Sequence, residues 1–168
     1  MPQHQKGNSP FTYEAAHSEI DSVNMRILEE LAGEPRLTMA ELGRRVGLSS
    51  PAIAERVRRL EESGVIAGYR LEINPGALGL PIGAYIRIRP NPGQLPQIIR
   101  VAQETPEVVE CHRVTGEDCF ILKVYIPAMD QLDRLLDSFL LYGTTTTLII
   151  QSSPVPSRSL PLPRLPQP

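Results

Sequence analysis

The 168-residue sequence has no tryptophan, two cysteines and no run of eighteen apolar residues without a charge. Without such a run a membrane-spanning helix is not expected, and the polar start MPQHQKGNSP gives no sign of a secretion signal. We therefore expect a cytosolic protein. Cys111 and Cys119 are too few for a disulfide framework and are expected to be free thiols. A hydrophobic content of 41% is enough to bury a core in one or two domains.

The sequence also lacks an overall basic charge, since its net charge is −2 and its isoelectric point is near 5.9. Residues 36–63 nevertheless carry six arginines against four glutamates, whereas residues 71–153 carry six basic and nine acidic residues. A local excess this small predicts weak, salt-dependent contact with phosphates from one copy of the chain. Several copies would be needed for useful binding to nucleic acid.

The segment 48–64, LSSPAIAERVRRLEESG, is predicted to be an amphipathic helix bounded at both ends. Ser49 or Ser50 can cap its first turn, Pro51 suits that turn, and Gly64 can adopt the left-handed conformation that ends a helix. The small, polar first turn and the arginines on its flank are typical of a DNA recognition helix, although most such helices are only solvated surface. Three apolar residues share its buried stripe: Ile53, Val57 and Leu60.

A first helix is predicted over 18–33. Ser18 can cap it together with Asp21, and Gly33 marks its end. Five apolar residues recur in it at helical spacing: Ile20, Val23, Ile27, Leu28 and Leu31.

A second, shorter helix is predicted over 38–46, where Thr38 and Glu41 form a capping box. Only Gly47 and Leu48 separate it from the third helix, and so short a turn sets two helices at a steep angle. The three helices therefore predict a helix-turn-helix.

The residues after the third helix, from Val65 to Ile73, are rich in strand formers and predict a strand or hairpin that would act as a wing. We place a winged helix-turn-helix domain over 18–69 and a hinge strand and linker over 70–81. Residues 1–17 are polar and predict a flexible arm. Residues 154–168 are proline-rich and predict an extended tail.

Residues 82–153 alternate between strand and helix patterns and predict an α+β fold, the ferredoxin-like βαββαβ unit. In that fold two helices cover one face of an antiparallel sheet. The other face is too apolar for open solvent, and we expect a partner subunit to cover it. Strands are predicted at 82–89, 108–115, 120–126 and 144–150, with helices at 95–102 and after an Asp130 cap. The face expected to be open carries Tyr85, Val109, Cys111, Ile121 and Tyr125.

Several short motifs follow one another in a fixed order and spacing, although none is specific alone. The motifs are IDxxNxxIL (20–28), RL (36–37), EL (41–42), GLS (47–49), RVRRLE (56–61), GVIAGY (64–69), LG (78–79) and VVECHRVTGED (108–118). From about Glu19 to Ser153, some four-fifths of the chain, their order and spacing resemble those of the Lrp/AsnC (feast/famine) transcriptional regulators.

The resemblance implies a winged helix-turn-helix joined by a hinge strand to a ligand-sensing ferredoxin-like domain. It also implies homodimers formed through the sheets, assembly to octamers or another higher state, and double-stranded DNA as partner. An effector, usually an amino acid, would bind near the loop 115–119. The sequence departs from the family pattern at Asn24, at Cys119 and at Thr144. The last two lie at the loop and the last strand, so the chain senses a different amino acid or none.

Candidate DNA contacts come from the third helix and its neighbour. Ser50, Ala52 and Glu55 are placed to reach base edges, and Glu55 can accept from cytosine N4. Arg56 can span base and phosphate, while three other arginines neutralise phosphates without reading sequence. The competing interpretation of Glu55 is a surface salt bridge to Arg59 within the helix. The full set is Arg44, Arg45, Ser49, Ser50, Pro51, Ala52, Glu55, Arg56 and Arg59.

Candidate effector contacts come from the loop. Thr115 and Gly116 can donate to a carboxylate, and Asp118 can accept from an ammonium group, which together suit an α-amino acid. The competing interpretation is an ordinary turn, with a positive φ angle at Gly116 and a local hydrogen bond from Asp118. The full set is Thr115, Gly116, Glu117, Asp118, Cys119 and Thr144.

No catalytic residue, metal or cofactor is expected. Cys111 and His112 are neighbours on a strand and face opposite sides, so they are poor joint metal ligands, and neither cysteine has an evident catalytic base. Two other functions remain open. An architectural protein that compacts DNA without operator preference would use the same helix, and sirohaem decarboxylases also resemble the family, although His112 is the only histidine in the second domain.

Overall fold

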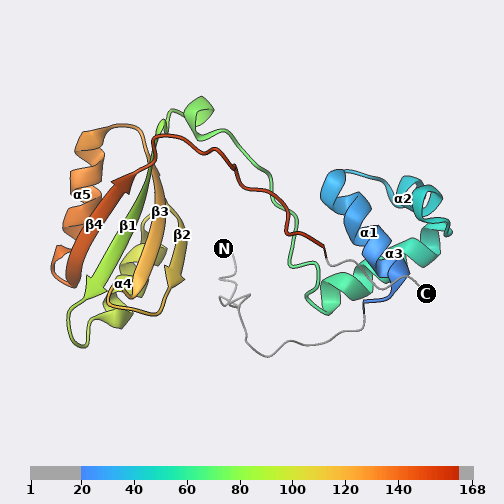
Figure 1. The fold of residues 1–168 in the computed structure, drawn as a ribbon, viewed down its shortest axis with the longest axis horizontal. Coiled ribbons are helices and arrows are strands. Elements are labelled where there is room, and N and C mark those ends of the chain that lie inside the picture. The colour runs from blue at the N-terminus through green and yellow to red at the C-terminus, as the bar shows by residue number, and fades with distance from the viewer. Residues whose placement is uncertain (1–19, 163–168) are drawn as a thin grey trace. The chain divides into compact units, whose positions relative to one another are not determined.

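The computed structural model describes residues 20–162, so the arm predicted over 1–17 and the last six residues of the tail lie outside the described residues. The chain forms two compact units, a helical unit up to Arg70 and a sheet unit over Leu71–Ser157 (Figure 1). Each unit has its own buried apolar cluster. The predicted fold class, a winged helix-turn-helix followed by an α+β domain, is confirmed.

The helical unit contains α1 (Ser22–Gly33), α2 (Met39–Val46) and α3 (Ser50–Glu62). Its core holds the apolar stripes predicted for all three helices, because each stripe faces the other two helices. Eight residues form this core: Ile27, Leu31, Leu37, Leu42, Val46, Ile53, Val57 and Leu60.

The helix boundaries correct two predicted caps and confirm a third. α1 begins at Ser22, with Asp21 as its cap through a hydrogen bond from Asn24 N–H, and Ser18 lies outside the described residues. Ser49 caps α3 by position alone, since its side chain makes no capping hydrogen bond. The cap of α2 by Thr38 is confirmed, because its hydroxyl accepts from Glu41 N–H at 3.2 Å.

The strand predicted over Val65–Ile73 is wrong for this chain, because residues 64–74 contain no strand. Val65 and Ile66 pack against the helical core, and Ile66 N–H donates to Leu60 O at 2.9 Å. Beyond them no described segment pairs with this stretch, and strand-forming residues cannot form a ladder without a partner strand. Leu71 consequently remains 80% exposed.

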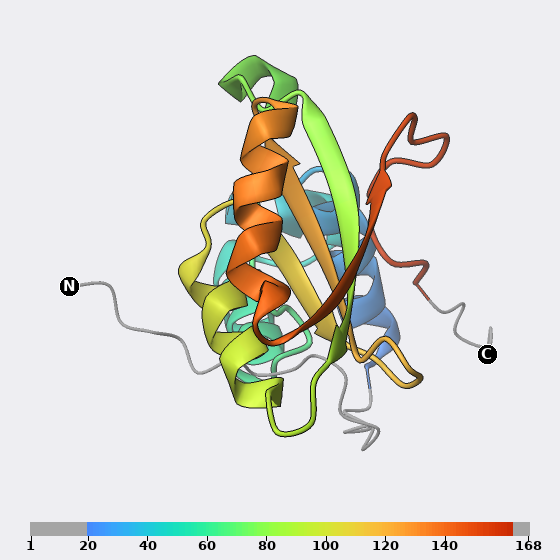
Figure 2. The same cartoon turned by 90° about the vertical axis from the view of Figure 1, so that its left-hand side faces the viewer.

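The sheet unit contains a short 3₁₀ turn, Pro75–Leu78, before its first strand. Its four strands lie in the order β2-β3-β1-β4, with every neighbouring pair antiparallel, which confirms the ferredoxin-like prediction. Figure 2 shows α4 and α5 covering the same face of the sheet. The elements are β1 (Ile82–Pro90), α4 (Leu95–Glu104), β2 (Val108–Arg113), β3 (Phe120–Ile126), α5 (Met129–Leu140) and β4 (Gly143–Ile149). Ala128, not Asp130, is the cap of α5, and Asp130 lies in its first turn.

A β-bulge between Val108 and Glu110 corrects the predicted faces of β2. Val108 pairs with Val124, and Glu110 pairs with Lys123, so Val109 is an extra residue in the edge strand. Beyond the bulge the alternation is reversed, and Cys111 pairs with the buried Leu122. Cys111 therefore lies on the face covered by helices and not on the open face where we expected it.

Candidate functional site

The turn between α2 and α3 brings the two helices into close contact. Gly47 adopts φ = 84°, and the N–H groups of Gly47 and Leu48 both donate to Gly43 O at 2.8 Å. A Cβ atom placed on Gly43 would lie 2.6 Å from Leu48 O, so only glycine fits there without movement. Gly43, which sequence reasoning missed, thereby fixes the position of the first turn of α3. A glycine inside a helical pattern is the signal that could have indicated it.

The first turn of α3 presents small residues to solvent. Ser49, Pro51 and Ala52 are exposed, and Ser50 is half-buried. Ile53, the next residue, is fully buried and anchors the turn to the core. The helix backbone can therefore approach a flat or grooved partner closely at this turn.

Glu55 is held by two arginines on its own helix. Its carboxylate accepts from Arg58 Nη2 at 2.7 Å and from Arg59 Nε at 2.8 Å. These hydrogen bonds, with Arg58 making the larger contribution, lower the pKa of Glu55 to about 2. The salt bridge to Arg59 that competed with a base contact does form.

Arg56 connects α3 to the beginning of α1. Its Nη1 donates to Asp21 Oδ2 at 2.7 Å and to Asn24 Oδ1 at 2.9 Å. The hydrogen bond from Asn24 N–H and the Arg56 guanidinium both lower the pKa of Asp21. Asn24, one of the departures from the family pattern, thus contributes an acceptor for Arg56.

The two adjacent arginines of α2 have different surroundings. Arg45 is 3.0 Å from Glu30 and 2.7 Å from Glu34, and these two carboxylates raise its pKa. Arg44 contacts only Glu41 among the described carboxylates, and its side chain is 75% exposed. Arg59 is similarly exposed, at 74%. Arg44 and Arg59 are therefore the candidate phosphate contacts with the greatest freedom to move.

The loop between β2 and β3 is held to strand β1 by ion pairs from two arginines. Arg87 Nε donates to Asp118 Oδ2 at 2.8 Å, and Arg89 pairs with Glu117. Sequence reasoning missed both arginines, although their spacing on one face of a strand was visible. Thr144 on β4 lies in register with Arg89, the arginine that pairs with Glu117 of the loop.

The ordinary-turn interpretation of the loop is confirmed in one respect, since Gly116 has φ = 117°. The predicted local hydrogen bond of Asp118 is wrong, because its carboxylate accepts from Arg87 on strand β1 and not from a group within the turn. Thr115 is exposed, and the Cys119 thiol lies 3.7 Å from Gly116 O. The loop residues are thus gathered in one place, with two cations beside two carboxylates.

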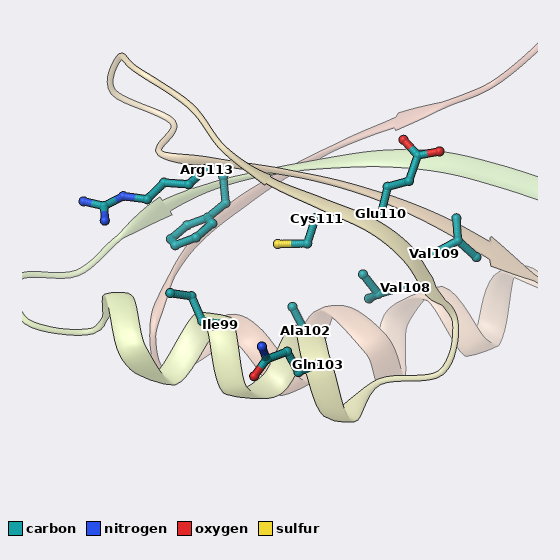
Figure 3. Close-up of a pocket in the computed structure, with 9 residues that line it drawn as sticks. Ile99, Ala102, Gln103, Val108, Val109, Glu110, Cys111 and Arg113 are labelled. Atoms are coloured by element: carbon teal, nitrogen blue, oxygen red, sulfur yellow. The ribbon is translucent and has the colours of Figure 1, made fainter. Parts of the chain in front are cut away.

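A cavity of 260 Å³ lies elsewhere in the sheet unit, between α4 and β2 (Figure 3). No residue of the loop 115–119 lines it. Its lining residues are Ile99, Ala102, Gln103, Val108, Val109, Glu110, Cys111, Arg113 and Phe120.

Residues 20–162 contain no group of three or more histidine, cysteine, aspartate and glutamate side chains that could hold a metal ion. Cys111 and His112 do face opposite sides of the sheet, since they pair with Leu122 and Ile121. None of the described helices is both long enough and apolar enough to cross a membrane.

Comparisons with known proteins match both units. Residues 20–67 match a family model for winged helix-turn-helix DNA-binding domains, and residues 83–160 match one for the Lrp/AsnC ligand-binding domain. LrpC of Bacillus subtilis, an HTH-type transcriptional regulator, is 32% identical over 79% of this chain and 92% of its own. The leucine-responsive regulatory protein of Escherichia coli is 36% identical over 73% of this chain and 77% of its own.

Solved structures give the same result for the fold. The LrpC structure aligns with a TM-score of 0.74 at 32% identity, covering 79% of this chain and 94% of LrpC. The regulator NMB0573 of Neisseria meningitidis, solved in complex with L-Met, aligns with a TM-score of 0.78 at 26% identity. That alignment covers 84% of this chain and 96% of NMB0573.

Proposed function

Because the chain belongs to the Lrp/AsnC family of transcriptional regulators, we propose that it binds specific operator sequences in double-stranded DNA through α3. The proposal rests chiefly on one observation, the small, exposed first turn of α3. Ser49, Ser50, Pro51 and Ala52 form that turn, and close contact with α2 at Gly43 fixes its position. A helix end of this kind can enter the major groove with its first residues against base edges.

The arginines divide into two roles in this proposal. Arg44 and Arg59, the most exposed, neutralise phosphates. Arg45 and Arg56 bond to groups of α1 and hold the helices in position, so we assign them an indirect contribution to binding. Glu55 reads a cytosine only by giving up one of its two arginine partners.

We further propose that the open face of the sheet forms a homodimer and that dimers assemble into an octamer or another higher state. Tyr85 is 38% exposed and Leu148 is 49% exposed on the strands of this sheet. Covering such side chains is favourable, by about 25 cal/mol for each Å² of apolar surface. The small charge excess of one DNA-binding unit predicts weak binding, and two or more such units in one assembly would compensate for that weakness.

An amino-acid effector is proposed for the loop 115–119 together with Thr144. Asp118 would accept from the ammonium group, and the N–H of Gly116 with the Thr115 hydroxyl would donate to the carboxylate. Arg87 and Arg89 supply cations beside these groups, so a zwitterion can exchange partners with the existing ion pairs. NMB0573, solved with L-Met, makes an amino acid a reasonable class of effector to test.

The test of DNA binding begins with selection of genomic fragments, followed by gel shifts with the selected operator and with random DNA. Arg44→Gln should weaken binding to both DNAs. The plot of log K against log salt, which has a negative slope, should become shallower by about one unit. Arg134→Gln is the matched control, since it removes the same charge from an exposed position of α5 in the sheet unit, and its slope should remain close to that of the native chain. Ser50→Ala should change the preference for the operator only.

Two results would overturn operator binding. If random DNA competes as well as the selected operator, the chain is an architectural DNA-compacting protein. If no fragment is enriched and no shift occurs at low salt, α3 does not bind DNA. The effector proposal is tested separately by calorimetry and light scattering with each amino acid, and the absence of heat and of any change in assembly would remove it.

A further inference from the structure

The cavity between α4 and β2 has apolar walls. Ile99 and Ala102 approach it from the helix, and Val108 and Cys111 approach it from the strand (Figure 3). The bulge at Val109 places both Val108 and Cys111 on this side of the sheet, whereas regular alternation would separate them. A volume of 260 Å³ lies below the range of pockets for drug-sized ligands and suits a smaller molecule.

One residue that lines the cavity, Arg113, carries a positive charge, and its side chain extends outward, away from Cys111 (Figure 3). Arg113 pairs with Phe120 and so begins on the face covered by the helices, and no carboxylate of residues 20–162 forms a salt bridge with it. The other charged lining residue is Glu110, whose carboxylate points away from α4 (Figure 3). That carboxylate lies 3.5 Å from Lys123 Nζ and 3.6 Å from His112 Nε2. Among the described residues that line the cavity, Arg113 is therefore the cation, and the carboxylate of Glu110 is engaged by Lys123 and His112.

We propose that this cavity binds a small monocarboxylic acid with an aliphatic or aromatic body. The body lies against Ile99, Ala102 and Cys111, and the carboxylate accepts from the guanidinium of Arg113 at the mouth. Arginine and carboxylate form strong, charge-assisted hydrogen bonds. An α-ammonium group would find no carboxylate there, since Glu110 faces the other side, so the cavity discriminates against amino acids. This site is independent of the effector proposed for the loop 115–119.

Three probes separate the contributions to binding. 4-Methylpentanoate has the apolar body and the carboxylate, 4-methylpentan-1-ol lacks the charge, and leucine adds an ammonium group to the same carbon skeleton. Binding to the full chain is measured by calorimetry and by protection of Cys111 from iodoacetamide, with Cys119 as an internal reference in the same mass spectrum. Burial raises the pKa of the Cys111 thiol, so alkylation is run at alkaline pH.

Three variants test the residues. Arg113→Gln should weaken binding of 4-methylpentanoate about tenfold or more through loss of the charge-assisted hydrogen bond. Arg134→Gln, an exposed arginine of α5 that does not line the cavity, removes the same charge and should leave binding unchanged. Ile99→Trp fills the cavity from a position that is 38% exposed and should abolish binding without disturbing the core.

The proposal is supported if 4-methylpentanoate protects Cys111 but not Cys119, and the alcohol and leucine protect at least tenfold less well. It is overturned if no probe protects Cys111 at millimolar concentration. Equal binding of acid and alcohol, or equal affinity of Arg113→Gln and the native chain, would overturn the assignment of the carboxylate to Arg113. Unchanged binding to Ile99→Trp, with a native circular dichroism spectrum, would show that the ligand lies elsewhere and overturn the site.

Discussion

Replacing Gly43 by alanine is expected to destabilise the helical unit, even though alanine is the better helix former. Gly43 is buried in α2, opposite the turn that leads into α3. The new Cβ would lie 2.6 Å from the carbonyl oxygen of Leu48, and 3.4 Å from Cγ1 of Ile53. The first contact is far below van der Waals distance and involves backbone, which cannot rotate away as a side chain can.

The magnitude follows from two opposing effects. An alanine in a helix interior is favoured over glycine by about 0.5–1 kcal/mol. Overpacking of a filled site costs about 1–3 kcal/mol. The upper part of that range applies because Leu48 N–H is bonded to Gly43 O at 2.8 Å, so moving the carbonyl of Leu48 also strains this bond. We expect a net loss of about 1–2 kcal/mol in the stability of the helical unit.

Amide hydrogen exchange read by mass spectrometry measures this loss, because it reports each unit separately. Peptides from α2 and α3 should exchange roughly 5- to 30-fold faster in Gly43→Ala, as expected for a loss of that size. Peptides from β1 and β3 serve as the internal reference. Gly33→Ala is the matched control, since its Cβ would meet nothing within 4 Å, and it should leave exchange unchanged or slow it.

Equal protection of α2 in Gly43→Ala and in the native chain would refute the reasoning. It would mean that the turn from Gly47 to Ser49 adjusts without cost and that Gly43 does not position α3. Slower exchange would be a stronger contradiction, because helix propensity alone would then govern this site.

Three further outcomes are expected. Arg56→Ala should lose the connection to Asp21 and weaken operator binding, measured by gel shift at moderate salt, by less than the ~1–3 kcal/mol expected for an arginine that contacts a base directly; unchanged affinity would contradict its positioning role. Because the pKa of Glu55 is depressed to about 2, its stabilising effect is full above pH 4.5 and is lost as the pH falls toward 2; Glu55→Gln should flatten the dependence of the urea midpoint on pH in that window. Gly143→Ala would place a Cβ 2.5 Å from Arg89 O and should destabilise the sheet unit by about 1–3 kcal/mol, seen as faster exchange in all four strands, with peptides from α1, α2 and α3 as the unchanged reference.

The sequence predicts the helices and strands of both units well because their apolar residues have a clear period. Leu42, Ile53 and Leu60 are buried as expected, and the strand alternation of Phe120, Leu122 and Val124 places these side chains in the core. These positions depend on local spacing and on burial, which the sequence shows directly.

The candidate sites were harder to predict because they depend on contacts between distant residues. Arg56 reaches Asp21, 35 positions earlier, and Arg87 reaches Asp118, 31 positions later. Side chains of this length have many possible partners, and the fold alone decides which partner is near. The sequence therefore indicates which residues carry charge but not which charges are already satisfied.

Two other failures have simple physical causes. A bulge adds one residue to β2, and the faces of every later residue in that strand are then reversed, which moved Cys111 to the helix side. The segment after Ile66 has the composition of a strand, yet a strand requires a neighbour, and the neighbour is not in the described part of the chain. The composition of a segment indicates its tendency to form a strand, but it does not show whether a partner strand is present.

The bulge in β2 also bears on how copies of this chain avoid unwanted association. β2 is an outermost strand, and a regular outer strand offers a continuous row of N–H and C=O groups to any similar strand. The extra residue at Val109 breaks this row and bends the edge, so edge-to-edge growth into extended sheets is disfavoured there. In the homodimer proposed above, copies would therefore meet through the broad face of the sheet and not through the edge of β2.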